Sequence, residues 1–310
     1  MRILITGGAG CLGSNLIEKF LPEGHEILVI DNFATGNRQV VPPVDRLIVE
    51  EGSVSDPDFV DRCFDEFNPE VVIHSAAAYK DPDDWEEDST TNVIGSIRVA
   101  KAAARVGVRR IINFQTALCY GRPESIPIPW DHPERPFTSY GISKTAGERY
   151  LINSGLSVIS LRLANVTGPR LAIGPIPTFY QRLKAGKSCF CSDTRRDFLD
   201  MEDFISIMER VMNKEAPTGV FNVSTGESRS ILDVFNAVSA YLEIEPEESP
   251  PVVPPGSDDV PEVVLDPSET EKVLGWKARI GFEDTIHRML AWYDEHGVSA
   301  IHSHLAEPKS

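Results

Sequence analysis

A tyrosine and a lysine four residues apart are the residues of this sequence best suited to move a proton. Tyr140 and Lys144 lie in the stretch SYGISK (139–144), and this spacing places both on one face of a helix. A tyrosine that acts as a base at neutral pH needs its pKa lowered by about 3, which costs about 4 kcal/mol. The Lys144 ammonium can supply part of this. Thr116 ends the apolar stretch RIINFQT (110–116), and we expect its hydroxyl beside the same site.

The N-terminal stretch TGGAGCLG (6–13) predicts a dinucleotide-binding loop. Gly7, Gly10 and Gly13 follow a predicted strand and open a predicted helix. In such a loop the first glycine permits a tight turn, the second lets the backbone approach a pyrophosphate, and the third lets the helix pack on the sheet. The free N–H groups and the dipole of the helix N-terminus then favour the diphosphate. The alternative is an ordinary strand–turn–helix.

Asp31 ends the next predicted strand, 18 residues after Gly13. A carboxylate at this position accepts hydrogen bonds from the adenosine ribose and repels a 2′-phosphate. The predicted cofactor is therefore NAD, and its nicotinamide cation is a second charge that can lower the pKa of Tyr140.

These residues need a sheet to position them. Short runs of Val, Ile and Leu alternate with helical patterns in the first half of the chain, which predicts an α/β fold with a doubly wound parallel (Rossmann) sheet. We expect strands at 2–6, 26–31, 46–53, 70–76, 110–116 and 157–165, and helices at 11–20, 89–106, 140–153, 200–213, 230–242 and 282–296. The predicted NAD-binding domain covers 1–165, with returning segments near 193–225 and 258–266. A smaller, partly interleaved C-terminal α/β region, 166–192 and 226–310, is predicted to bind substrate.

Composition narrows the class of protein. The chain has 310 residues, 41% hydrophobic and 25% charged, with a net charge of −17, which argues against nucleic acid or an anionic membrane as partner. We find no apolar run of the ~18 residues that a membrane span needs. Five scattered cysteines do not suggest a disulfide framework or a metal site, so we expect no metal and a reducing cytoplasm.

Charge is unevenly distributed along the chain. The segment 161–196 holds seven basic residues and one acid, which predicts either a local anion site or a solvated surface. The tract DPDDWEED (81–88) holds six acids in eight residues, and we interpret it as a solvated loop without a function.

The chain resembles the extended short-chain dehydrogenase/reductase family, and within it the NAD-dependent nucleotide-sugar epimerases and dehydratases, such as UDP-glucose 4-epimerase. The resemblance covers nearly the whole chain. It rests on TGGAGCLG, DNFATGNR (31–38), TNVIGS (91–96), QTALCYG (115–121), SYGISK, RLANVTGPR (162–170), RRDFLDMEDF (195–204), GVFNVSTGE (219–227) and LDPSETEKVLGW (265–276).

This resemblance implies a reversible oxidation at C4 of the sugar in a nucleoside diphosphate sugar, with UDP as the expected nucleotide. Tyr140 would take the proton of the 4-hydroxyl, assisted by Thr116 and Lys144. It also places Asn165 and Arg196 near the substrate diphosphate. The cofactor-binding set that it implies is Gly7, Gly10, Cys11, Leu12, Gly13, Asp31, Asn32, Gly36, Ser53, Val54, Ala76, Ala77, Lys80, Tyr140 and Lys144.

The two residues that follow Thr116 bear on the choice of reaction. Family members that eliminate water carry an acid and a base there, whereas this chain has Ala117 and Leu118. The resemblance therefore favours C4 epimerisation of a UDP-hexose, UDP-N-acetylhexosamine or UDP-uronic acid, in polysaccharide biosynthesis or a related pathway. A 4-ketoreductase or dehydrogenase is the alternative, and a non-catalytic dinucleotide sensor is a third. The family also pairs two subunits through the helices predicted at 89–106 and 140–153, so we expect a homodimer.

The chain departs from the family in the segment VPPGSDDVPEVV (253–264), which lacks the arginine that usually reaches the diphosphate. Either Arg196, with Arg170 or Arg182, replaces that arginine, or the substrate differs from the usual one of the family. Val263 matches the residue that gates the pocket for the sugar C2 substituent, and its small size would admit an N-acetyl group.

Overall fold

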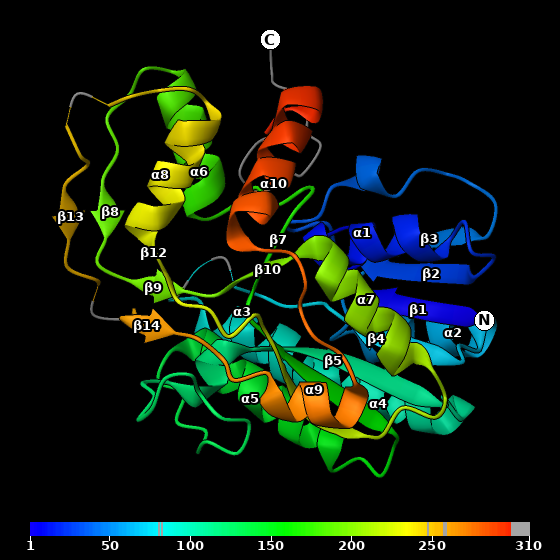
Figure 1. Ribbon diagram of the computed structural model, residues 1–310. Helices are drawn as coiled ribbons and strands as arrows, with labels where there is room; N and C mark the ends of the chain where they lie inside the picture. The colour runs from blue at the N-terminus through cyan, green and yellow to red at the C-terminus, as the bar shows by residue number, and fades with distance from the viewer. Residues whose placement is uncertain (80, 82, 247, 257–258, 299–310) are drawn as a thin grey trace.

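A seven-stranded parallel sheet forms the centre of the molecule (Figure 1). The structure, a computed structural model, describes residues 1–79, 81, 83–246, 248–256 and 259–298. The strand order is β11-β6-β5-β4-β1-β2-β3. The strands are β1 (Arg2–Thr6), β2 (Glu26–Asp31), β3 (Leu47–Glu51), β4 (Val71–His74), β5 (Arg110–Thr116), β6 (Val158–Leu163) and β11 (Gly219–Val223). The order reverses between β1 and β4, and ligands of such sheets lie at the carboxyl ends of the strands beside that reversal.

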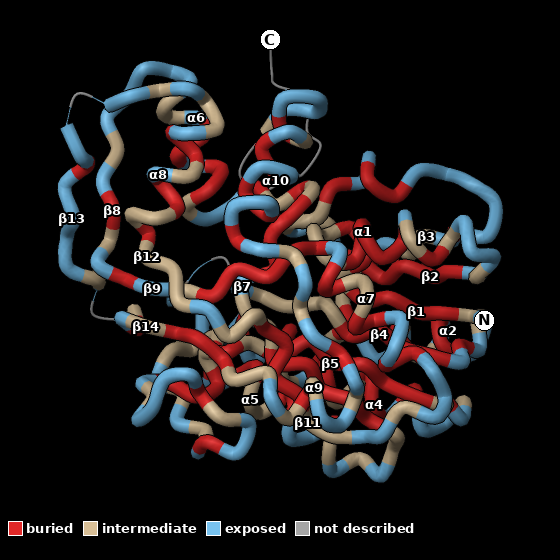
Figure 2. Tube along the Cα trace, viewed as in Figure 1, coloured by how far each residue is buried: buried red, intermediate tan, exposed pale blue. Residues whose placement is uncertain are grey.

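Helices cover both faces of this sheet because the side chains of each strand alternate between the faces. Ile3 and Ile5 of β1 pack with α1 (Cys11–Phe20) and α7 (Met201–Met212). Leu4, between them, packs on the other face with α2 (Pro57–Phe67), α4 (Gly95–Val106) and α5 (Ser139–Ile152). The strands are the buried centre of the fold (Figure 2). The predicted doubly wound α/β fold is confirmed.

A separate apolar core joins the helices α6 (Pro175–Lys184), α8 (Ile231–Tyr241) and α10 (Phe282–His296). Short strands surround it: β7 (Asn165–Thr167) pairs with β10 (Phe198–Asp200), β8 (Cys191–Ser192) with β13 (Val252–Val253), and β9 (Arg195–Arg196) with β12 (Arg229–Ser230) and β14 (Glu262–Val263). The chain leaves the large sheet after β6 and returns to it with β11, so the two parts are interleaved. The domain boundaries given above stay a prediction.

The helix predicted at 89–106 begins earlier than expected and is not uniform. It consists of α3 (Trp85–Asp88), the π-helical η2 (Ser89–Ile94) and α4. The early start has a local cause, because the Asp84 carboxylate caps the helix by accepting the N–H of Glu87 at 2.9 Å. The remaining elements are α9 (Ser268–Leu274), which lies beside β11, and the short 3₁₀ turns η1 (Arg38–Val40) and η3 (Ala117–Tyr120).

Within the described part of the chain, no helix combines the length and the apolar character that crossing a membrane requires.

Candidate active site

The glycine loop joins β1 to α1 where the strand order reverses. Gly7 has φ +67°, and a Cβ there would lie 2.8 Å from the main chain of Ala76. A Cβ on Gly13 would lie 2.6 Å from the Cα of Gly8, so a side chain there would push α1 off the sheet. Gly10 caps α1 without a side-chain hydrogen bond, and the first residues of α1 line a cavity. The N–H groups of this first turn are therefore available to a diphosphate.

Asp31 is fixed at the carboxyl end of β2. Its side chain is 7% exposed and accepts the backbone N–H groups of Ala9 and Phe33, both at 2.8 Å. Burial raises the pKa of Asp31, and these two hydrogen bonds oppose the rise. Gly36 brings the following loop against the glycine loop, because a Cβ there would lie 2.9 Å from that of Ala9. A fixed carboxylate beside free helix N–H groups is the arrangement that an adenosine ribose and a pyrophosphate require, so these residues fit a dinucleotide.

The cavity has a volume of about 1170 Å³ and gathers nearly all of the predicted site residues. Gly13 is not part of its lining and acts through the packing of α1, while Lys80 lies outside the described residues. The predicted residues that line the cavity are Gly7, Gly10, Cys11, Leu12, Asp31, Asn32, Gly36, Ser53, Val54, Ala76, Ala77, Thr116, Tyr140, Lys144, Asn165 and Arg196.

The three residues predicted to do chemistry meet in this cavity from two elements. Thr116 ends β5, and its hydroxyl accepts the N–H of Leu118 at 3.1 Å, which leaves the hydroxyl proton free for donation to a ligand. Tyr140 and Lys144 lie in the first turns of α5, whose start Thr138 caps by accepting the N–H of Gly141 at 3.1 Å.

The pKa values of the tyrosine and the lysine move in opposite directions. Burial raises the pKa of Tyr140, and the nearby Tyr79 and Asp88 raise it further. Burial lowers the pKa of Lys144 to about 8, against the Glu148 carboxylate, which raises it. Burial and these two neighbours thus oppose ionisation of Tyr140, and the expected help from Lys144 stays a prediction.

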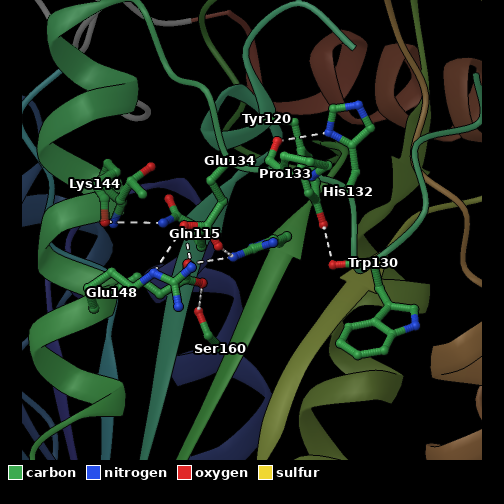
Figure 3. A network of polar contacts seen from close by, with 12 residues as sticks. Gln115, Tyr120, Trp130, His132, Pro133, Glu134, Lys144, Glu148 and Ser160 are labelled. Carbon is green, nitrogen blue, oxygen red and sulfur yellow. Dashed lines mark hydrogen bonds and ion pairs between the residues drawn. The ribbon is translucent and has the colours of Figure 1, made fainter. Parts of the chain in front are cut away.

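A buried polar network holds α5 to the sheet behind the cavity (Figure 3). Glu148 lies one turn after Lys144, and its carboxylate accepts Arg162 at 2.8 Å and the Ser160 hydroxyl at 2.5 Å. Arg162 also pairs with Glu134 and is 3% exposed. The helix that carries Tyr140 and Lys144 is therefore tied to β6 by charge-assisted hydrogen bonds.

Arg196 is the arginine of the cavity wall. It pairs with Asp259, which lines the same cavity, and donates to the carbonyl of Val260 at 2.8 Å. Its guanidinium is held at one place by these partners. Val263 is buried in β14 and does not line this cavity, so the expected gate at Val263 is not seen.

The basic segment 161–196 does not form a joint anion site, contrary to one of the two expectations. Arg196 is its only basic residue in the lining of the described cavity. Arg170 pairs with Glu18, Arg182 donates to the Ser188 carbonyl at 2.8 Å, and neither lines the described cavity. The others lie elsewhere: Arg162 in the buried network, Lys184 with Asp294, Arg195 with Glu262, and Lys187 exposed.

Sequence reasoning missed an acidic wall of the cavity. Asp81, Asp84, Glu87 and Asp88 line it, so the tract interpreted as a solvated loop is partly a cavity wall. Asp88 is 2% exposed and accepts the Ser139 hydroxyl at 2.6 Å, next to Tyr140. The sequence signal for this wall was that the end of the acidic tract continues directly into the following helix.

Fold and site together define a class of protein, namely a Rossmann-fold enzyme with a dinucleotide loop and a Thr–Tyr–Lys set in one cavity. The chain belongs to the NAD-dependent epimerase/dehydratase family, whose model matches residues 3–224. NAD is its cofactor, and the predicted membership of the extended short-chain dehydrogenase/reductase family is confirmed.

Named relatives agree with this assignment. UDP-glucose 4-epimerase of Mycolicibacterium smegmatis is 30% identical over 94% of this chain and 98% of that protein. The Bordetella bronchiseptica enzyme WbmG, solved with NAD and UDP, is 67% identical, covers 99% of each chain and has a TM-score of 0.96. WbmH of the same organism, solved with NAD⁺, is 39% identical over 96% of this chain and 99% of that one, with a TM-score of 0.90. The expectation of an NAD-dependent epimerase is confirmed.

Proposed function

We propose that this enzyme epimerises a UDP-sugar at C4 through a 4-keto intermediate. The observation that carries the proposal is the meeting of Thr116, Tyr140 and Lys144 in the cavity that also holds the glycine loop. The substrate class is supported by the UDP bound to WbmG and by the 4-epimerase relative. The sugar is a hexose, an N-acetylhexosamine or a uronic acid.

In the proposed mechanism each residue has one task. Tyr140 takes the proton of the sugar 4-hydroxyl, and the Thr116 hydroxyl donates to the same oxygen. Lys144 supplies positive charge beside them. The bound NAD supplies the acceptor and donor of the hydride. Returning the hydride to the other face of the keto sugar, with the proton from Tyr140, gives the 4-epimer.

Ala117 and Leu118 support epimerisation over elimination. Neither side chain lines the cavity, and neither has an acid or base to act at C5. Asp88 also lines the cavity, but its carboxylate is engaged by the Ser139 hydroxyl, which donates to it at 2.6 Å. Asn165 and Arg196 bind the substrate diphosphate in this proposal.

Proton NMR in D2O tests the reaction directly. The purified protein receives UDP-glucose, UDP-N-acetylglucosamine or UDP-glucuronate without added cofactor. We expect a new 4-epimer without deuterium at C4 or C5, because the hydride returns within the site and C5 is not deprotonated. Turnover only after NAD(P)H and a keto sugar are supplied would instead establish a reductase.

Replacing Tyr140 by Phe tests the base. We expect kcat to fall by about 10²–10⁴, the range for loss of a general acid–base group, while UDP still binds. Tyr150→Phe is the matched control, because Tyr150 lies on the same helix with 54% exposure and outside the cavity. Equal activity of Tyr140→Phe and Tyr150→Phe would rule out the assignment.

A further inference from the structure

Gln115 connects the two elements that carry the proposed catalytic residues. It precedes Thr116 in β5, is 2% exposed and faces the cavity. Its side-chain Nε2 donates to the main-chain carbonyl of Lys144 in α5 at 3.1 Å, and its Oε1 accepts the backbone N–H of Thr116 at 2.8 Å. Figure 3 shows Gln115 with its amide directed at Lys144. One amide thus bonds to the main chains of both residues.

The chemistry of its partners fixes the orientation of this amide. A carbonyl can only accept and a backbone N–H can only donate, so the NH2 end must face Lys144 and the oxygen must face Thr116. Both polar ends are satisfied in a buried position, where each unpaired group would cost about 1–3 kcal/mol. The side chain therefore has one favourable position, in which it holds β5 and α5 at a set distance.

The bond to Lys144 is not needed for the helix itself. Lys144 lies inside α5 (Ser139–Ile152), where its carbonyl is also the acceptor of the regular helical hydrogen bond. The extra donor comes from another element and adds nothing to the helical ladder. Its effect is on the placement of the helix relative to the strand.

We propose that Gln115 is a positioning residue, which sets the separation between the Thr116 hydroxyl and the Tyr140–Lys144 pair. The inference rests on the proposed function for the roles of those three residues. A misplacement of reacting groups by about 1 Å can cost about 10²-fold in rate. The two hydrogen bonds of the Gln115 side chain therefore act on the chemical step and not on the affinity for the nucleotide.

Asn113 provides a matched control on the same strand. It lies two residues before Gln115, on the same face of β5, and is also 2% exposed. Its Nδ2 donates to the Ser160 hydroxyl at 2.9 Å and touches no main-chain atom of a proposed catalytic residue. Removing either amide costs a buried polar contact. Of the two, Gln115 bonds directly to α5, whereas Asn113 reaches that helix only through Ser160 and Glu148.

The experiment compares Gln115→Met with Asn113→Leu in the full-length, NAD-loaded protein. For a sugar that the parent enzyme converts, we expect Gln115→Met to lower kcat by about tenfold to 10²-fold with KM nearly unchanged. We expect Asn113→Leu to lose thermal stability to a similar degree with kcat per NAD-loaded site nearly unchanged. If Gln115→Met does not fold, Gln115→Asn replaces it, because the shorter side chain cannot span both partners.

Hydrogen exchange of the backbone amides gives a readout that does not depend on turnover. We expect the Thr116 amide to exchange faster in Gln115→Met than in the parent or in Asn113→Leu. Unchanged exchange at Thr116, an unchanged kcat in Gln115→Met, or an equal loss of kcat in both variants would overturn the proposal. If the parent converts no sugar, the proposed function fails. The exchange rates alone then decide whether the Gln115 side chain holds Thr116 and Lys144 in place.

Discussion

Arg196 lines the described cavity and binds the diphosphate in the proposed function, whereas its neighbour Arg195 does not line the cavity. The two neighbours point to different places, because Arg195 donates to the Ser228 hydroxyl at 2.7 Å outside the cavity lining. Asp259 pairs with Arg196, so its negative charge offsets part of the positive charge of the guanidinium. The proposed phosphate site therefore has one guanidinium among the described lining residues.

We predict that Arg196→Gln weakens UDP binding by about 10- to 100-fold, since a charged hydrogen bond contributes about 1.5–3 kcal/mol. Arg195→Gln should leave the affinity nearly unchanged, because that side chain is 44% exposed and bound elsewhere. Isothermal titration of the NAD-loaded proteins with UDP measures both constants. A similar loss in the two variants would contradict the separate placement of the two arginines.

The residues that sequence reasoning found and missed differ in where their partners lie. The glycines, the tyrosine and the lysine belong to compact motifs, so their spacing was sufficient. Asp88 pairs with Ser139, 51 positions away, and Asp259 pairs with Arg196, 63 positions away. Such contacts depend on how distant elements meet, which no local pattern contains. The separate directions of Arg195 and Arg196 were hidden for the same reason.

Elements with clear periodicity were predicted close to their observed bounds, as for the helices at 11–20 and 282–296. Three of the helices that were not predicted, α2, α6 and α9, share a sequence feature. Each begins at or just after a proline, and α6 contains two, at 175 and 177. Proline is tolerated in the first turn of a helix, but in sequence it reads as a turn. Strand ends were overextended where the chain bends into the cavity, as after His74.

His74 links three elements in the interior. It ends β4, its Nδ1 lies 2.8 Å from the Thr6 hydroxyl of β1, and its Nε2 lies 3.0 Å from the Ser96 hydroxyl of α4. Burial and, to a smaller extent, the charge of Lys144 lower the pKa of His74 to about 3. The folded protein thus keeps this imidazole neutral where the unfolded chain, with a pKa near 6.5, takes up a proton.

We predict that this histidine makes the fold less stable as pH falls below about 6.5. Between about 6.5 and 3 the unfolded state binds one more proton than the folded state, so stability falls by about 1.4 kcal/mol per pH unit and has its full value above 6.5. His74→Gln should reduce the slope of unfolding free energy against pH over pH 5–6.5, measured by denaturant titration. His296→Gln, at an exposed site, is the control. Equal slopes in parent and His74→Gln would exclude this linkage.

At the scale of the whole molecule, the helices on one side of the sheet leave apolar side chains uncovered. Ile94 of η2 is 41% exposed, while Ile142 and Tyr150 of α5 are 51% and 54% exposed. α4 and α5 pack against each other and lie together in Figure 1. Exposed large apolar side chains gathered on paired helices are typical of a subunit interface.

We propose that the protein is a homodimer formed through these helices. Light scattering at micromolar concentration should give about twice the chain mass of 34.3 kDa. Ile142→Arg should shift the mass towards one chain, because it buries a charge at the contact. A parent protein that scatters as a single chain would refute the proposal.

The edge position of β11 has a consequence for synthesis on the ribosome. β11 pairs with β6, with Phe221 opposite Leu161, yet α6 and α7 are translated between the two strands. Six strands have therefore emerged while the seventh is still being made, and β6 waits with an open edge. An open strand edge is a template for pairing with another chain. While residues 164 to 223 are being synthesised, the unpaired edge of β6 is open to pairing with a neighbouring nascent chain. A chaperone, or a wider spacing of ribosomes on the messenger RNA, should therefore raise the yield of folded enzyme.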